Sequence, residues 1–110
     1  MKELKTVNEW YDVLEQSKEN PLFVLKHSTT CPVSAAAYNA FESSATDVPK
    51  YFLKVRESRP VSNEIESNLR VEHQSPQLFL LKDGKAVWHA THYSISGPQI
   101  EHAVKDYGSN

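Results

Sequence analysis

The chain has 110 residues, 39% hydrophobic and 24% charged, with a formal net charge of −2 and a pI near 6.2. These values predict one globular domain over residues 1–110 and argue against a nucleic-acid surface, which normally carries excess Lys and Arg. No apolar run approaches the roughly 18 residues of a membrane span, and the polar N-terminus lacks a signal-peptide core. With one cysteine no internal disulfide can form, so we expect a cytoplasmic protein in a reducing setting.

The first quarter of the chain predicts a helix and then a buried strand. A capping box at residues 6–9 is followed by apolar residues at helical spacing, which indicates an amphipathic helix over residues 7–18. The nearly all-apolar run Leu22–Leu25 is typical of a strand covered on both faces. Its polar exit, residues 26–30, then delivers Cys31.

The rest of the chain alternates further helices and strands. The expected elements are a helix from Pro32 that stops at residues 47–49, a strand over 51–56, a short helix opened by Pro60, strands over 77–81 and 86–91 joined by an Asp83-Gly84 turn, and a helix from Ser96 to Gly108. The early β-α-β unit implies parallel strands, and the later hairpin adds antiparallel ones. We therefore expect an α/β fold with a four-stranded mixed sheet flanked by helices on both faces.

The cysteine stands at the junction of the first long strand and the second helix. Pro32 follows it at the favoured first helical position, and Ser34 stands three residues after the sulfur. Unpaired N–H groups and the helix dipole at such a position favour the thiolate over the thiol. Cys31 is therefore a candidate nucleophile. Ser34 is either a polar first-turn residue or a hydrogen-bond donor to the thiolate.

The element order and two short motifs resemble the thioredoxin and glutaredoxin superfamily, from about Pro21 to Tyr107 and with an extra N-terminal helix. Residues 31–34, Cys-Pro-Val-Ser, match the C-P-x-C motif of glutaredoxins with serine in place of the second cysteine. Ser75-Pro76 matches the position of the superfamily's cis-proline, which faces the active cysteine. The resemblance implies a thioredoxin-like fold and a cis Ser75–Pro76 bond whose backbone pairs with the substrate.

A closer resemblance is to the monothiol bacilliredoxin C (YtxJ) family of Gram-positive bacteria. It rests on the segments 28–34 (Ser-Thr-Thr-Cys-Pro-Val-Ser), 59–63 (Arg-Pro-Val-Ser-Asn) and 75–77 (Ser-Pro-Gln). The resemblance implies thiol–disulfide exchange that removes bacillithiol from mixed disulfides on proteins. Cys31 is then the catalytic residue, and the expected substrate-binding residues around it are Thr30, Pro32, Ser34, Ser75 and Pro76.

The same resemblance implies the partners. We expect bacillithiolated client proteins and bacillithiol itself as co-substrate, with no tightly bound cofactor, metal, nucleic acid or membrane. An NADPH-dependent bacillithiol disulfide reductase acts downstream as a separate protein, since the chain has no G-x-G-x-x-G dinucleotide motif of its own.

Two alternatives from other classes stay open. A glutaredoxin-like iron–sulfur cluster carrier would bridge a cluster through Cys31, although such proteins typically show C-G-F-S, from which Pro32 and Val33 depart. A thioredoxin-like binding module without catalysis would keep its partners after loss of the thiol. An arsenate reductase is disfavoured because no C-x5-R pattern follows Cys31.

Other polar residues carry weaker signals. The five histidines show no metal-ligand spacing, and His27 is near enough in sequence to pair with Cys31, with its geometry undetermined. Several cations are candidates for holding the malate carboxylates of bacillithiol: Lys26, Lys54, Arg56, Arg59 and Arg70. Ser28 stands where glutaredoxins often carry a glutathione-binding lysine, which argues against glutathione as the carrier thiol.

Overall fold

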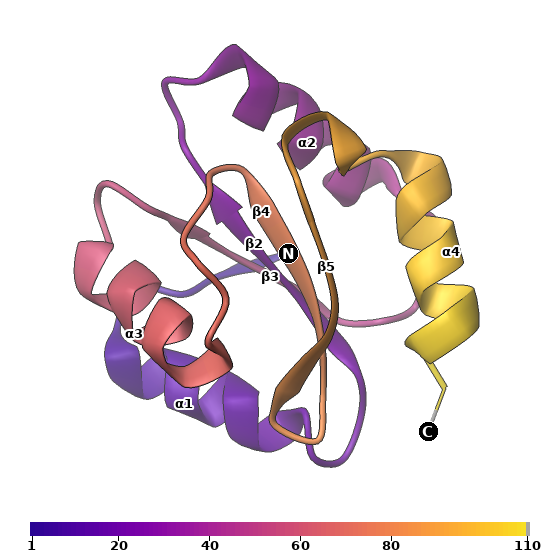
Figure 1. Cartoon of the computed structure of the whole chain (residues 1–110), viewed down its shortest axis with the longest axis horizontal. Coiled ribbons are helices and arrows are strands. Elements are labelled where there is room, and N and C mark those ends of the chain that lie inside the picture. Colours follow the sequence, from indigo (N-terminus) through magenta and orange to yellow (C-terminus); the bar gives the residue numbers. More distant parts are fainter. Residues whose placement is uncertain (110) are drawn as a thin grey trace.

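The computed structural model describes residues 1–109 as a mixed sheet with helices on both faces (Figure 1). The strands are β1 (Lys2–Glu3), β2 (Leu22–His27), β3 (Lys50–Lys54), β4 (Gln77–Lys82) and β5 (Lys85–Thr91). The helices are α1 (Val7–Gln16), α2 (Pro32–Ser43), α3 (Arg59–Leu69) and α4 (Gly97–Tyr107), with a short 3-10 helix η1 (His92–Ser94). No helix within residues 1–109 combines the length and apolar character that crossing a bilayer requires.

The strands lie in the order β1-β3-β2-β4-β5. β3 runs parallel to β1 and β2, whereas β4 is antiparallel to both β2 and β5, so the predicted mixed sheet is confirmed. The predicted count of four strands is wrong by one, because Lys2 and Glu3 add a short edge strand beside Tyr51 and Phe52. Two polar residues are too few to show an alternating pattern, and their pairing depends on the neighbouring strand.

Several predicted boundaries shift by a few residues. α1 ends at Gln16 rather than at residue 18, and β3 covers residues 50–54 rather than 51–56. The larger difference is in β2, which continues through Lys26 and His27 although the polar residues there predicted an exit from the sheet. Both residues keep their places in the ladder opposite Leu53 and Lys54 of β3.

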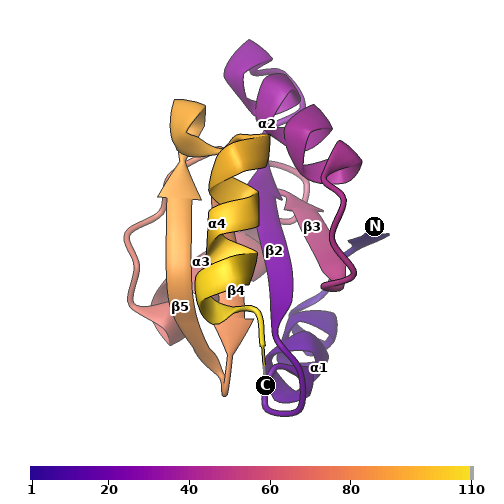
Figure 2. The ribbon, with the colours of Figure 1, turned by 90° about the vertical axis from the view of Figure 1, so that its right-hand side faces the viewer.

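Two hydrophobic layers separate the sheet from its helices, and Figure 2 shows α4 in front of the strands. On one face Leu22 and Val24 of β2 pack with the buried residues of α1 and α3, namely Trp10, Val13, Val61 and Ile65. On the other face Phe23 and Leu25 pack with those of α2 and α4, namely Ala37, Phe41, Ile100 and Ala103. This alternation explains the continuous apolar run of β2, because both faces of the strand are covered.

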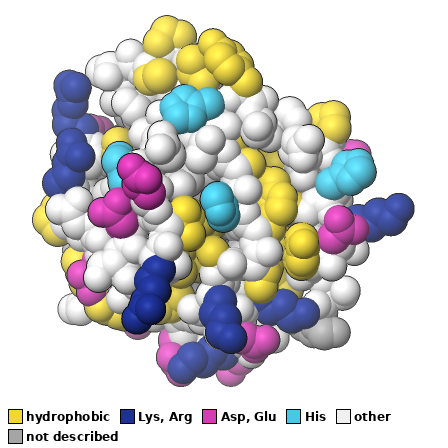
Figure 3. Space-filling view, in the orientation of Figure 1, with side chains coloured by type: hydrophobic (Ala, Val, Ile, Leu, Met, Phe, Trp, Pro, Cys, Tyr) yellow, Lys and Arg dark blue, Asp and Glu magenta, His cyan; other side chains and the backbone are white. Residues whose placement is uncertain are grey.

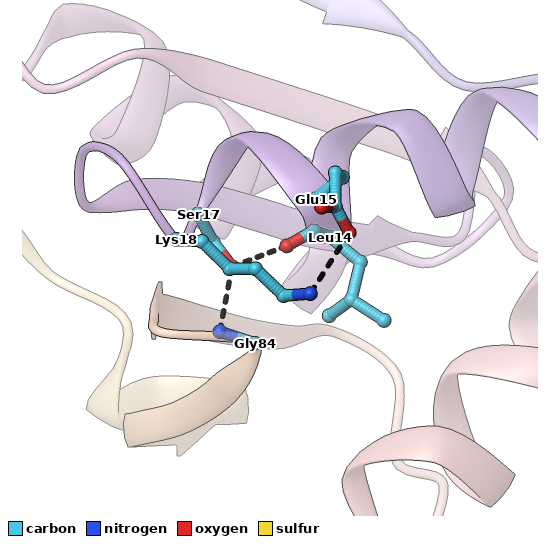
Figure 4. Close-up of polar contacts among 5 residues, drawn as sticks. All are labelled: Leu14, Glu15, Ser17, Lys18 and Gly84. Atoms are coloured by element: carbon cyan, nitrogen blue, oxygen red, sulfur yellow. Dashed lines mark hydrogen bonds and ion pairs between the residues drawn. The ribbon is translucent and has the colours of Figure 1, made fainter.

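A buried serine fastens the far end of the sheet to α1. Ser17 caps α1 and is 1% exposed; its hydroxyl donates to Leu14 O at 2.5 Å and accepts from Gly84 N at 2.9 Å (Figure 4). Asp83 and Gly84 both have positive φ, 56° and 74°, as a two-residue hairpin turn of the primed type requires. The predicted Asp-Gly turn is confirmed, and its contact with Ser17 joins the β4–β5 hairpin to the first helix.

We expect Ser17→Ala to lower the free energy of unfolding by about 1–3 kcal/mol, because the partly buried Gly84 N–H would lose its acceptor. Urea unfolding followed by circular dichroism measures this loss. The exposed Glu15–Lys18 ion pair next to it supplies the control, since Lys18→Ala is expected to change stability by less than about 0.5 kcal/mol. Equal losses in the two variants would contradict the role of Ser17.

Candidate active site

Cys31 lies at the start of α2, where the sequence predicts it. It is the N-cap residue, with extended backbone angles of φ −105° and ψ 121°, and Pro32 begins the helix. The turn before it is closed by a hydrogen bond from Cys31 N to Ser28 O at 3.3 Å. The sulfur makes no capping hydrogen bond, and the residue is partly exposed. The residue is therefore partly accessible to solvent, and its thiol is not engaged in capping the helix.

Ser34 holds this turn from inside. Its side chain is fully buried, and its hydroxyl oxygen accepts a hydrogen bond from Ser28 N at 2.8 Å. The same oxygen lies 2.7 Å from His27 Nδ1, and we assign the hydroxyl as the donor in this contact because a neutral imidazole protonated on Nε2 offers Nδ1 as the acceptor. Ser34 thereby fastens the turn 28–34, and its alternative role as a hydrogen-bond donor to the sulfur stays a prediction.

His27 is built to accept that hydrogen bond. Its ring stacks at a tilt on Tyr38 of α2, with ring centroids 4.8 Å apart, and Tyr38 meets Phe52 edge-on. Burial lowers the pKa of His27 from its ordinary value of 6.5, and the nearby Lys54 cation lowers it further, against the opposing effect of Glu57. A neutral imidazole with its proton on Nε2 leaves Nδ1 free to accept from Ser34.

The Ser75–Pro76 segment lies at the same end of the sheet as the cysteine turn (Figure 1). Its peptide bond is cis, as the resemblance implied. Pro76 directly precedes Gln77, which pairs with Lys26 near the end of β2. The Pro76 carbonyl accepts a hydrogen bond from His92 N at 3.1 Å. Ser75 lies outside β4 and enters none of the backbone–backbone hydrogen bonds found within residues 1–109. Its hydroxyl oxygen is buried without a partner in that part of the chain.

The remaining predicted residues separate into those that lie at this end of the sheet and those that do not. Thr30 and Pro32 are exposed on either side of the cysteine, and hydrophobic side chains gather over α2 in Figure 3. Arg59 begins α3 at the same end, whereas Arg70 caps the opposite end of that helix. Lys26 is fully buried. Arg70 and Lys26 are therefore wrong as candidates for contacting a thiol bound at Cys31.

Comparisons with known proteins agree with this geometry. A family model described as monothiol bacilliredoxin BrxC matches residues 2–100. The chain belongs to this family. A solved structure described as a proposed oxidoreductase with a thioredoxin fold is 36% identical, with a TM-score of 0.86 over 93% of this chain and 91% of that one.

Thioredoxins from other organisms share the fold at lower identity. The Fasciola hepatica thioredoxin is 14% identical with a TM-score of 0.78, over 97% of this chain and 99% of that one. The Nicotiana alata thioredoxin NaTrxh is 22% identical with a TM-score of 0.73, over 99% and 92%. The predicted thioredoxin-like α/β fold is thereby confirmed. Family and fold together make this bacilliredoxin family member a thiol oxidoreductase.

Two neighbouring residues of β2 make contacts that the sequence pattern did not predict. His27 was considered only as a partner of Cys31, whereas it contacts Ser34 and Tyr38. The sequence offers Lys26 as a cation for the malate carboxylates of bacillithiol, whereas it is buried on the opposite face. One signal was available: in a strand covered on both faces, consecutive residues point to opposite layers. A strand extended by two residues would have placed Lys26 and His27 on opposite faces of the sheet.

We expect Ser34→Ala to lower the free energy of unfolding by about 1–3 kcal/mol, because the partly buried Ser28 N and His27 Nδ1 both lose their hydrogen-bond partner. The turn that carries Cys31 should also loosen, and faster exchange of the Ser28 amide proton in NMR would report it. Ser43→Ala, on the exposed last turn of α2, is the matched control. An unchanged Ser28 exchange rate would contradict the fastening role.

The histidines predict a pH dependence of stability. Burial is the main cause that lowers the pKa values of both His27 and His73 from 6.5, so the unfolded chain takes up protons that the folded chain does not. Their contribution is therefore complete above the unfolded value and is lost as the pH falls through the lowered folded values. The free energy of unfolding from urea titrations should decrease from about pH 7.5 to about pH 5.

A variant separates His27 from the other groups that titrate in this range. His27→Asn retains an acceptor near the position of Nδ1 and removes the titration, so its loss of stability toward acid should be smaller than that of the unmodified protein. His102→Asn, at an exposed position of α4, should leave the pH dependence as it is. An equal slope in both variants would contradict the assignment.

Proposed function

We propose that this protein removes bacillithiol from mixed disulfides on client proteins through Cys31. The observation that carries the proposal is the solitary thiol: Cys31 is the one cysteine of the chain, partly exposed at the start of α2. Ser34 occupies the position of a second, resolving cysteine and is engaged in the turn. One sulfur can take over a small thiol and pass it on, but it cannot close a disulfide within the chain.

In the first step the Cys31 thiolate attacks the bacillithiol sulfur of a protein–S–S–bacillithiol disulfide. A bond forms between Cys31 Sγ and that sulfur while the original disulfide bond breaks, and the client cysteine leaves as a thiolate that takes up a proton from water. The client is thereby reduced, and Cys31 carries the bacillithiol. The number of disulfide bonds is unchanged, so no separate oxidant or reductant is needed.

In the second step free bacillithiol, as its thiolate, attacks the bacillithiol sulfur bound to Cys31. Bacillithiol disulfide forms, and Cys31 leaves as the thiolate, ready for another client. A separate NADPH-dependent reductase then returns bacillithiol disulfide to two thiols. We place this cycle in a reducing cytosol, where the free thiol pool that regenerates Cys31 is maintained.

The Ser75–Pro76 segment supports the selection of proteins as substrates. The Ser75 backbone lies outside the sheet ladder at the end where β2 leads to Cys31, and it is free of backbone hydrogen bonds within residues 1–109. An extended client segment would pair with this backbone as a short additional strand, a mode of recognition that tolerates different sequences. Attack on the bacillithiol sulfur, and not on the client sulfur, then follows from the direction in which the bound segment presents its disulfide.

The test is intact-mass spectrometry after the reduced protein is mixed with a bacillithiolated protein. We expect one bacillithiol to appear on Cys31 while the client loses it, and we expect free bacillithiol to remove the adduct faster than glutathione does. Cys31→Ser should accept nothing. A wild-type protein that stays unmodified while the client keeps its bacillithiol would refute the proposal.

Ser34→Cys provides a matched variant for the monothiol mechanism. It places a second thiol at the third residue of α2, where it should attack the adduct, release bacillithiol and leave an internal disulfide. The mass spectrum should then show a loss of two hydrogens instead of a stable adduct. A stable bacillithiol adduct in this variant would contradict the assignment of position 34 to the resolving step.

A further inference from the structure

A lysine is buried beneath the active-site end of the sheet, on the face opposite α2. Lys26 of β2 is 0% exposed, although Leu22 and Val24 on the same face of the strand are apolar and pack in the core. Its Nζ donates to Ser62 O of α3 at 3.1 Å and lies 3.1 Å from Nδ1 of His73. Burying an ammonium group is costly, and an apolar residue would fill this layer without that cost.

The partner of this lysine belongs to the segment that leads to Ser75 and Pro76. His73 N donates to Glu66 Oε2 of α3 at 2.7 Å, and the Ser62 hydroxyl lies 3.3 Å from His73 Nδ1. We call residues 72–76 the proline loop. Through its contact with His73, Lys26 links β2 to this loop. The strand that delivers Cys31 and the loop that lies beside it therefore meet at Lys26.

The protonation states fit a donor on Lys26 and an acceptor on His73. Burial lowers the pKa of His73, and the nearby Lys26 and Arg59 cations lower it further, whereas Glu66 opposes this shift. Burial lowers the pKa of Lys26 to about 8, with Glu66 opposing it. A neutral imidazole protonated on Nε2 presents its Nδ1 lone pair, and the lysine amine donates to it in either of its own protonation states.

Gln77 holds the same loop from its other end. This buried residue of β4 pairs with Lys26 in the ladder. Its Nε2 donates to Glu72 O at 3.1 Å, and its Oε1 accepts from Gln74 N at 3.3 Å. With Pro76 O bonded to His92 N, the proline loop is fixed on both sides of Ser75 while the Ser75 backbone is left out of those bonds.

We propose that Lys26 is a positioning residue for client recognition: its hydrogen bond to His73 sets the proline loop against the strand that leads to Cys31. The proposal rests on the proposed function, because it takes this loop as the site where a client backbone pairs. Lys26 touches no reacting atom in this scheme. Its effect reaches the substrate through the placement of Ser75.

The experiment compares two substrates in the full-length protein. Lys26→Met keeps the length of the side chain and removes the donor, so KM for a bacillithiolated protein should rise about fivefold while kcat changes less than about twofold. The mixed disulfide of bacillithiol and 2-mercaptoethanol has no chain to pair with the loop, and its kcat/KM should stay within about twofold. An equal decrease in kcat/KM for both substrates, or an unchanged KM for the bacillithiolated protein, would overturn the proposal.

Three further variants separate positioning from lost stability. His73→Ala should raise KM for the bacillithiolated protein as Lys26→Met does. The double variant Lys26→Met/His73→Ala should raise this KM no further than either single change. His73→Asn keeps an acceptor, so its KM should stay near the wild-type value. Val24→Ala removes volume from the same face of β2, and it should lower Tm without raising KM. A rise in KM in Val24→Ala equal to that in Lys26→Met would assign the effect to stability and refute the positioning role.

Amide exchange in the free protein distinguishes a failure of this inference from a failure of the proposed function. Lys26→Met should speed exchange at Gln74 and His92, the amides that anchor the proline loop, and Val24→Ala should not. Unchanged exchange at both amides would overturn the role of Lys26 whatever the enzyme acts on. A wild-type protein that turns over neither substrate would instead refute bacillithiol removal, and the exchange rates would then decide the positioning role.

Discussion

The hydroxyl group of Ser34 accepts a hydrogen bond from Ser28 N and is hydrogen-bonded to His27 Nδ1, and the placement of Cys31 depends on these two contacts. They tie the end of β2 to the first turn of α2, so the short turn between strand and helix has little freedom. The group is fully buried, where a hydrogen bond left unmade costs most. The thiol is thus presented by a rigid frame to which its own sulfur contributes no capping bond.

The residue at position 34 affects both the chemistry at Cys31 and the stability of the turn. A second cysteine at position 34 would allow an internal disulfide, whereas serine closes the turn and leaves Cys31 dependent on an external thiol. Under the proposed monothiol mechanism, the chemistry at Cys31 and the stability of the turn that carries it therefore both depend on the side chain at position 34. A replacement that preserves one of these properties need not preserve the other.

The end of β2 organises the site on both faces of the sheet. His27 points toward α2 and meets Ser34, while Lys26 points toward α3 and meets His73. Neutral histidines serve as acceptors in both places, and burial is the main cause that keeps their pKa values low. In the arrangement we propose, these two adjacent residues position the two segments of the candidate active site, the cysteine turn and the proline loop. Neither residue needs to touch the substrate to do so.

Most of the architecture and the place of Cys31 at the start of α2 were predictable from the sequence. Apolar spacing, the capping box at residues 6–9, the Asp83-Gly84 turn and the Cys31-Pro32 junction are local signals, and each reflects a preference that a few residues express by themselves. The tertiary structure alone decided the pairing of β1, the burial of Lys26 and the partners of Ser34. These depend on which residues from distant segments meet, since a polar side chain at a strand end is exposed or buried according to what covers it.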